Sequence, residues 1–410
     1  MWSEFRIQIK QGTPLAFGTV IAALCSYVAL ATSARLLGPA EFGVLGAILA
    51  VLSVVAVALR PLHTSATHLA ARAASDRRVV SGLTGPLLVS SIALTCVVAI
   101  AFALLDDPLT SALHIQDRRV LWVAAPLIGL QVWWLLESGL IAGMQRFHLF
   151  ALDSIADAAV RALVIAPLTL IAGVAGSVAA YATGVAVAGA LGAAQLGGLR
   201  WRLPRHVFDR ELLDVGGGSI LLTLAISAAQ NLDVLFLRTY ADPEAVGRYA
   251  ACATIGNFLF ALSAPLYVPL YPRTVRALKE RLPTLPILAS VLLPFAVIGV
   301  VAVGVSWAFG QFATGLFFGA QFAPAGDVLP AYFTKIVCLG ALFIVGQYAL
   351  ATRRSPTIVP GTLLALACVS VIPVIRPEPF QAAMLCATGG GVASILTLVL
   401  QRSRSAPPHS

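Results

Sequence analysis

The chain has 410 residues, of which 59% are hydrophobic and only 11% are charged, and its mean hydropathy is +0.90. A soluble domain carries about 25% charged residues, so this composition excludes an ordinary soluble enzyme or binding domain. The formal net charge of +9 raises the question of a nucleic-acid partner, which only the distribution of the basic residues can answer.

Twelve apolar segments follow one another from Pro14 to Leu400. Each is close to the roughly 20 residues that a helix needs to cross about 30 Å of hydrocarbon. The predicted fold class is therefore all-α, a polytopic membrane protein of about twelve transmembrane helices. The predicted spans are 14–36, 41–65, 84–105, 119–143, 149–172, 176–198, 215–239, 246–271, 284–309, 327–350, 355–375 and 379–401.

Most basic residues lie on one side of these spans. If the amino terminus is inside, eighteen of the 27 Lys and Arg residues fall in cytoplasmic segments and six in outer loops or outer span ends. This asymmetry follows the positive-inside rule and predicts that both termini are cytoplasmic. It also accounts for the net charge, so we expect no nucleic-acid partner. The remaining three bases, Arg60, Arg161 and Lys335, fall within the spans.

The second half of the chain repeats the first. A shift of 204 residues gives eight identities in a gapless window of 39 residues. Because a repeat of six spans leaves both halves with the same orientation, the halves relate by an axis along the membrane normal, as in many secondary transporters. We expect an N-terminal six-helix lobe over 1–200, a cytoplasmic linker over 201–214, and a C-terminal six-helix lobe with a short tail over 215–410. The identical positions are Pro39, Gly43, Ala47, Pro61, Leu62, Arg72, Ala73 and Arg77, over Pro243, Gly247, Ala251, Pro265, Leu266, Arg276, Ala277 and Arg281.

Motifs for nucleotide or metal chemistry are absent from the sequence. It contains no GxxxxGKS or GxxxxGKT loop, so this chain is not expected to use ATP by itself. It also contains no HExxH motif, and no Ser, His and Asp arrangement suits catalysis. We therefore predict a protein that is not an enzyme, with no catalytic residues, no cofactor and no metal site.

Charged residues inside the spans are the candidate functional residues. A charge at the bilayer centre costs on the order of 2.5–3.5 kcal/mol on the insertion scale, so such side chains should face the bundle interior or a wet cavity. Asp153, Asp157 and Arg161 are spaced i, i+4 and i+8, which places them on one helix face. Arg161 lies near the midplane, roughly 18 Å from the inner end of its span. Asp157 and Arg161 either line a cavity or neutralise each other as a structural pair.

Five further residues complete the predicted substrate-binding set. Arg60, near the inner end of its span, either binds a ligand or extends to the interface. Lys335 lies two turns inside the outer end of the tenth span, where we expect a cavity role. Glu137 has no evident partner nearby in the sequence and is either functional or a protonated structural carboxyl. Asn231 and Asp233 belong to a polar stripe of the seventh span, which hydrogen bonds between helices would equally explain.

Four stretches of the chain are similar to one known family. They are ARLLGPAEFGVLGAILAVLSVVAVALRPL at 34–62, GLIAGMQRFHLFALDSIADAAVRALV at 139–164, NLDVLFLRTYADPEAVGRYAACATIGNFLFALSAPLYVPLYP at 231–272 and GLFFGAQFAPAGDVL at 315–329. They resemble, in this order, the first hairpin, the helix 4–5 junction, the helix 7–8 region and the stretch before helix 10 of the polysaccharide and O-antigen flippases. This family belongs to the multidrug/oligosaccharidyl-lipid/polysaccharide (MOP) exporter superfamily.

The resemblance implies a MATE-like pair of lobes around a central cavity with alternating access. It implies a cargo of lipid-linked oligosaccharide, commonly on undecaprenyl pyrophosphate, which moves from the inner to the outer leaflet for lipopolysaccharide or other polysaccharide biosynthesis. It also implies the bacterial plasma membrane, with membrane lipids and the glycosyltransferases and polymerase of the same pathway as partners. Cavities of this family use basic residues for the anionic headgroup, and Arg161 is the matching position.

A cation-coupled drug or metabolite antiporter of the MATE type is the alternative. Several such antiporters place a coupling carboxylate in their first helix, and the first predicted span has none. The count of twelve spans also differs from the fourteen typical of peptidoglycan-precursor flippases. The charges within the spans do not decide between a flippase and an antiporter, because bases and acids are both present.

Overall fold

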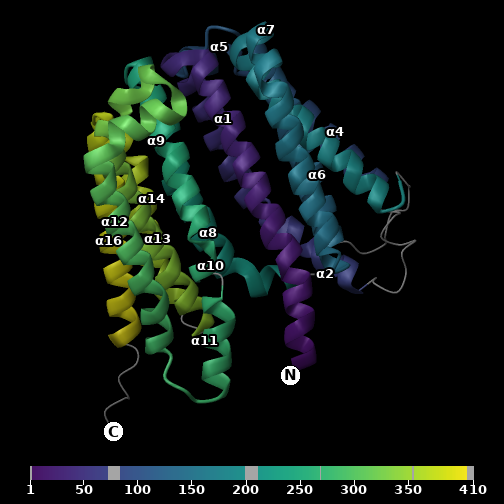
Figure 1. Cartoon of the computed structure of the whole chain (residues 1–410), viewed down its shortest axis with the longest axis vertical. Coiled ribbons are helices and arrows are strands. Elements are labelled where there is room, and N and C mark those ends of the chain that lie inside the picture. Colours follow the sequence, from purple (N-terminus) through teal and green to yellow (C-terminus); the bar gives the residue numbers. More distant parts are fainter. Residues whose placement is uncertain (1, 73–83, 199–210, 268, 353–354, 404–410) are drawn as a thin grey trace. The chain divides into compact units, whose positions relative to one another are not determined.

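The computed structural model describes residues 2–72, 84–198, 211–267, 269–352 and 355–403 (Figure 1). Within these ranges the regular structure consists of α-helices and two 3-10 helices, so the predicted all-α class is confirmed. The elements are α1 (Trp2–Ala58), α2 (Arg60–Arg72), α4 (Thr84–Leu104), α5 (Asp106–Ala112), α6 (Arg119–Gly143), α7 (Phe147–Gln195), α8 (Glu211–Arg238), α9 (Pro243–Leu262), α10 (Ala264–Tyr267), α11 (Leu270–Lys279), α12 (Leu285–Phe318), η1 (Ala320–Asp327), α13 (Leu329–Ala351), η2 (Ser355–Thr357), α14 (Ile358–Ser370), α15 (Ile372–Ile375) and α16 (Pro379–Ser403).

Ten of the described helical segments are long and apolar enough to cross a membrane. The bounds of α6, Arg119–Gly143, coincide with those of the fourth predicted span. Two segments, Gly18–Ala58 of α1 and Phe147–Gln195 of α7, have 41 and 49 residues, and each covers most of two predicted spans. At 1.5 Å per residue, a straight helix of either length would far exceed the roughly 30 Å of the hydrocarbon core.

Both of these long helices are interrupted. In α1 the break is at Gly38, whose φ of 74° and ψ of 173° are conformations that glycine adopts readily. In α7 the break is at Ala172 and Gly173, and Gly173 has a φ of 55°. Each break falls between two predicted spans, so each long helix consists of two helical segments. Twelve crossings remain the prediction for the whole chain.

The chain divides into two compact units. The first unit comprises Met1–Leu37 and Ala58–Asp214, and the second comprises Gly38–Val57 and Val215–Ser410. This division differs from the predicted lobes at one segment, because 38–57 was expected in the N-terminal lobe. The predicted linker, 201–214, lies largely outside the described residues. Superposition of the two six-helix halves stays a prediction.

The first unit is built around α6. Helices α2, α4 and α7 all pack on it. One core cluster joins α2, α6 and the end of α7, where Ala66, Leu140 and Leu196 are buried. On the α4 side, Ser91 donates a hydrogen bond of 2.6 Å to the backbone oxygen of Gly129. This contact requires two helix backbones to come close together, which small residues permit in membrane proteins.

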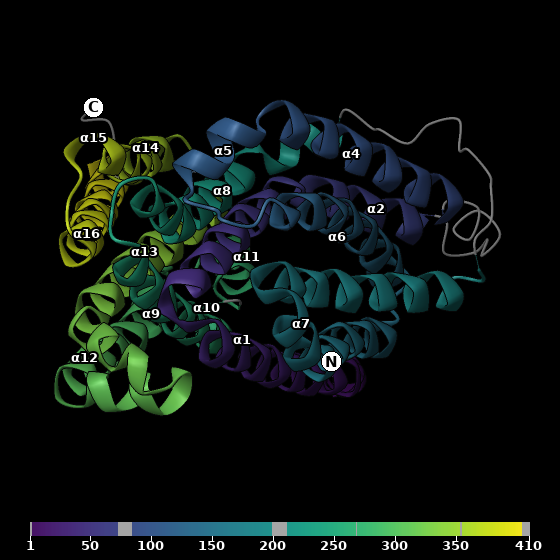
Figure 2. The same cartoon turned by 90° about the horizontal axis from the view of Figure 1, so that it is seen from above.

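The second unit is built around α13, which lies between α12 and α16 (Figure 2). Its core joins Leu222 and Ile226 of α8 to Leu339 and Leu342 of α13 and to Ala393 of α16. Helices α14 and α16 also pack against each other. The buried apolar side chains of α13 therefore join three neighbouring helices, α8, α14 and α16, in one core.

The segment 38–57 packs within the second unit through aromatic and glycine contacts. The Phe42 ring lies 6.0 Å from the ring of Phe318 and 5.6 Å from that of Phe322. A Cβ placed on Gly43 would lie 3.0 Å from the amide nitrogen of Gly247 in α9. These contacts explain why the segment belongs to the second unit rather than to the predicted first lobe.

Positions that the repeat relates contact each other at this packing interface. Gly43 lies against Gly247, and a Cβ placed on Gly46 would lie 2.7 Å from the Cβ of Ala250. Both pairs have the offset of 204 residues that the sequence shows. Contacts between equivalent positions are those expected beside a twofold axis. The packing thus supports the internal repeat independently of the eight identities.

Candidate functional site

Arg161 and Asp157 form an ion pair in the first half of α7, as their i, i+4 spacing predicts. A guanidinium nitrogen, Nη2, donates to Oδ2 of Asp157. The two side chains are 12% and 13% exposed, so the pair is partly accessible rather than sealed. Arg161 Nε and Asp157 Oδ1 have no hydrogen-bond partner among the described residues. Both of these atoms are buried, so the protein leaves one donor and one acceptor of the pair unsatisfied in this conformation.

The second half of α7 completes the environment of this pair. The ring of Tyr181 lies 4.4 Å from the guanidinium carbon of Arg161. A Cβ placed on Gly184 would lie 2.6 Å from Asp157 Oδ1, so only glycine lets this segment approach the carboxylate. The break at Gly173 folds the two halves of α7 together and so positions Tyr181 on the arginine. A cation–π contact of this kind is worth about 0.5–2 kcal/mol, depending on desolvation.

Glu137 and Asp153 form a second polar cluster in the first unit. Trp133 Nε1 donates to Glu137 Oε1 at 2.8 Å, and Gln195 Nε2 donates to Asp153 Oδ1 at 2.7 Å. Both carboxyl groups belong to residues that are only 1% exposed. The expectation that Glu137 has no partner nearby in the sequence was wrong, because Trp133 lies one helical turn before it.

Gly192 lies between these two carboxyl groups. A Cβ at this position would lie 3.1 Å from Glu137 Oε2 and 3.6 Å from Asp153 Oδ2. Glu137 Oε2 is buried and has no hydrogen-bond partner among the described residues. No basic side chain pairs with either acid within the described structure. Two buried acids without a base favour a state in which at least one of them carries a proton.

Asp233 and Lys335 form an ion pair in the core of the second unit, between α8 and α13. Lys335 Nζ donates to Asp233 Oδ2 and, at 3.0 Å, to the backbone oxygen of Gln230. Tyr249 Oη also donates to Asp233 Oδ2, and the Tyr332 ring lies 4.4 Å from Lys335 Nζ. Both charged side chains are 0% exposed. In this conformation the pair is enclosed by protein, so Lys335 is not accessible to a ligand.

Asn231 lies near this pair in sequence but has different partners. Its side-chain amide donates to the backbone oxygen of Ser227 at 2.8 Å. Its side-chain oxygen accepts a hydrogen bond from Asn257 Nδ2 in α9 at 3.2 Å. The polar stripe of the seventh predicted span therefore makes the hydrogen bonds between helices that were one of its two interpretations.

Arg60 begins α2, and its side chain is exposed. It has no ion pair among the described residues. An exposed arginine at a helix start suits either an interfacial position or a ligand-binding one, and both interpretations stay open.

The structure thus separates the seven predicted site residues into distinct groups. In the first unit, Arg161 pairs with Asp157, Glu137 lies with Asp153, and Arg60 stands apart. In the second unit, Asp233 pairs with Lys335 and Asn231 binds Asn257. Sequence reasoning missed the partners Tyr181, Gln195, Tyr249 and Tyr332, whose only signal is an uncharged polar side chain within an apolar helix.

Comparison with solved structures identifies the fold. A MATE-family multidrug resistance transporter of the MOP superfamily, in an inward-facing conformation, matches 93% of this chain and 94% of its own, with a TM-score of 0.75 and 16% identity. The lipid II flippase MurJ, in an inward closed conformation, matches 95% of this chain and 87% of its own, with a TM-score of 0.74 and 10% identity. A MOP-superfamily transporter from Pyrococcus furiosus, described as having a binding pocket of reverse polarity, matches 97% and 94%, with a TM-score of 0.65 and 16% identity. At these identities the likeness establishes the fold.

The fold and the ten long apolar helical segments of the described residues are those of a multi-pass membrane protein. A family model described as polysaccharide biosynthesis protein matches residues 9–278, which is more than half of the chain. The chain therefore belongs to the polysaccharide biosynthesis protein family. No curated protein sequence matches the chain.

Proposed function

We propose that this protein moves a lipid-linked oligosaccharide, carried on a polyprenyl pyrophosphate, from the inner to the outer leaflet by alternating access. The family supports a role in polysaccharide biosynthesis, and the likeness to a lipid II flippase supports a lipid-linked cargo. The proposal includes a bacterial plasma membrane, two cytoplasmic termini, and work alongside the glycosyltransferases and polymerase of the pathway. The observation that carries it is the partly accessible ion pair of Arg161 with Asp157, deep in an apolar helix.

Arg161 is suited to an anionic headgroup. Its planar guanidinium presents donors that match two phosphate oxygens at once. Asp157 neutralises this charge in the empty transporter, where a lone buried guanidinium would be costly. A pyrophosphate group would compete with Asp157 for the guanidinium, while Tyr181 keeps the arginine in place. Of the other two bases within the predicted spans, Arg60 belongs to the same unit as Arg161 and is exposed.

The direction of transport requires a source of free energy. An inside-negative potential favours outward movement of negative charge by about 2.3 kcal/mol per charge per 100 mV, so an anionic cargo needs no ATP. A proton gradient across the membrane, coupled to transport through protonation of a buried acid, is the second source. Glu137 and Asp153 are the candidates, because they are buried together without a base.

Reconstituted vesicles that contain a fluorescent lipid-linked oligosaccharide test the role of Arg161. Flipping is measured as the change in the fraction of the fluorescence that a quencher added outside the vesicles removes. We expect Arg161→Ala to abolish flipping and Arg161→Lys to retain part of it, because lysine keeps the charge but not the planar donors. Arg118→Ala is the matched control, because Arg118 also pairs with acids but is exposed.

The second variant, Arg161→Gln/Asp157→Asn, removes both charges and so avoids an unpaired carboxylate. It should fold and still fail to flip. Full flipping by this double variant, or by Arg161→Ala, would reduce Arg161 to a structural partner of Asp157 and remove the observation on which the proposal rests.

A cation-coupled MATE-type antiporter of drugs or metabolites remains the second candidate function. The buried acids Glu137 and Asp153 favour it, since a proton or monovalent cation between them would couple to a conformational change. A resistance assay distinguishes the two. Protection of cells from cationic drugs that is lost in Glu137→Gln, with no effect on polysaccharide, would favour the antiporter.

A further inference from the structure

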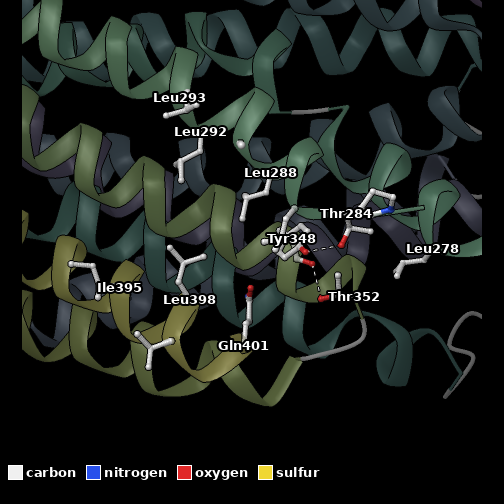
Figure 3. Close-up of a pocket in the computed structure, with 14 residues that line it drawn as sticks. Leu278, Thr284, Leu288, Leu292, Leu293, Tyr348, Thr352, Ile395, Leu398 and Gln401 are labelled. Carbon is white, nitrogen blue, oxygen red and sulfur yellow. Dashed lines mark hydrogen bonds between the residues drawn. The ribbon is translucent and has the colours of Figure 1, made fainter. Parts of the chain in front are cut away.

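A groove on the second unit has no role in the proposed transport step. It has a volume of about 770 Å³ and lies between the start of α12, the end of α13 and the end of α16 (Figure 3). This volume is within the range of about 300–1,000 Å³ that small-molecule sites occupy. Two of its walls open to the apolar surface of the unit, because Leu293 is 64% and Ile395 63% exposed.

The polarity of the groove changes along its length. At one end, the hydroxyl groups of Thr284 and Tyr348 lie 2.7 Å apart, and Thr352 lies beside them (Figure 3). Toward the other end the walls consist of aliphatic side chains, among them Leu292 and Ile395. Such a site matches an amphiphile, with its polar part at the hydroxyl end and its chain along the leucines.

Two basic residues belong to the turn that leads into the polar end, between Leu278 and Thr284. Lys279 and Arg281 are exposed, and in the sequence they lie between Leu278 and Pro283, which line the groove. Neither has an ion pair among the described residues, whereas the neighbouring Arg276 is bound by Glu280. Arg281 also has a φ of 56°, a conformation that glycine or asparagine usually supplies at the end of a helix. At position 281, therefore, a positively charged side chain occupies a backbone conformation that glycine or asparagine adopts more readily.

We propose that this groove binds one acyl chain of an anionic membrane phospholipid, whose phosphate lies at Lys279 and Arg281. Exposed apolar walls exclude a water-soluble anion, and the unpaired bases select an anionic over a zwitterionic headgroup. Basic residues at the edge of the bilayer attract anionic lipid with about 1 kcal/mol each. The site is distinct from Arg161, which belongs to the other unit, and it does not depend on the proposed transport function.

Native mass spectrometry tests the proposal on the full chain. The protein is reconstituted with equal phosphatidylglycerol and phosphatidylcholine, extracted in mild detergent, and scored for retained lipid. We expect the unchanged protein to retain phosphatidylglycerol in preference to phosphatidylcholine. Ala289→Trp places an indole in the groove and should lower retention about tenfold, because chain burial is lost. Ala308→Trp, on an exposed face of the same helix, is the matched control.

Charge variants separate the headgroup from the chain. Lys279→Gln/Arg281→Gln should retain lipid but lose the preference for phosphatidylglycerol. Arg376→Gln is the control, because Arg376 has the same left-handed backbone as Arg281 at a different loop. Leu293→Trp is a second groove variant in case Ala289→Trp fails to fold.

Three outcomes would overturn the proposal. The first is no retained phosphatidylglycerol in the unchanged protein. The second is equal retention by the groove variants and Ala308→Trp. The third is displacement of phosphatidylglycerol by an equimolar amount of undecaprenyl phosphate, which would assign the groove to a polyprenyl chain instead.

Discussion

The two buried ion pairs of this protein differ in accessibility, and this difference separates a candidate ligand-binding base from a structural one. The Arg161 and Asp157 side chains are 12% and 13% exposed. Lys335 and Asp233 are fully enclosed, and two tyrosines surround them. A charge at the second site is compensated within the protein, so a headgroup could reach Lys335 only after the helices separate.

The first prediction concerns Lys335. Lys335→Met leaves the Asp233 carboxylate buried without its partner, which should cost about 3–5 kcal/mol of stability. The double variant Lys335→Met/Asp233→Asn removes both charges and should recover most of the loss. Thermal unfolding in detergent measures both. A stable Lys335→Met that fails to flip lipid would instead make Lys335 a ligand-binding residue, as the sequence suggested.

The second prediction concerns Glu137 and Asp153. Glu137→Gln keeps an oxygen for Trp133 and resembles the protonated acid, so we expect it to fold with unchanged thermal stability. If the pair couples transport to protons, flipping by this variant should no longer respond to an imposed pH gradient. Asp117→Asn, at an exposed loop acid, is the control. An unchanged response in Glu137→Gln and in Asp153→Asn would show that these two acids do not couple transport to protons.

Sequence spacing predicted local pairs better than distant ones. The four-residue spacing of Asp157 and Arg161 was sufficient, because helix geometry alone places them together. Trp133 and Glu137 have the same spacing, but an indole donor in an apolar helix gives no comparable signal. Lys335 and Asp233 are 102 residues apart, so only the packing of α8 against α13 shows that they meet. The intramembrane charges were thus recognised, and their partners largely were not.

At the scale of the helices, the sequence predicted where the chain is interrupted but not which neighbour each segment takes. The breaks of α1 and α7 fall in the predicted gaps, because Gly38 and Gly173 adopt positive φ there. The placement of 38–57 with the second unit depends on close glycine contact with α9. Hydropathy carries no information on such a contact, since both surfaces are apolar.

The third prediction tests that contact. A Cβ on Gly247 would lie 1.6 Å from the backbone oxygen of Pro39, so Gly247→Ala must force the segments apart. We expect a loss of about 1–3 kcal/mol of stability. Gly304→Ala is the control, because it has the same helical context and nothing within 4 Å of its Cβ. Equal unfolding temperatures for the two variants would show that the segment does not pack on α9 in the membrane.

At the scale of the whole molecule, the internal repeat and the basic asymmetry make independent statements about topology. The repeat of 204 residues requires an even number of crossings per half if both halves have one orientation. The basic asymmetry predicts that both termini lie on the cytoplasmic side. The contact of Gly43 with Gly247 adds a structural observation that agrees with the repeat. The three together predict an even count of crossings with both ends inside.

The fourth prediction tests this sidedness with single cysteines. Asp117 and Glu280 are suitable positions, because both are loop acids with similar side-chain exposure, 46% and 48%. A membrane-impermeant thiol reagent added to intact cells should label Asp117→Cys and not Glu280→Cys, and should label both after lysis. The six native cysteines, which lie in apolar helical segments, are the background that the unchanged protein measures. Labelling of Glu280→Cys from outside would reverse the orientation, place the basic segments in the outer compartment, and remove the membrane potential as an explanation for outward movement of an anionic cargo.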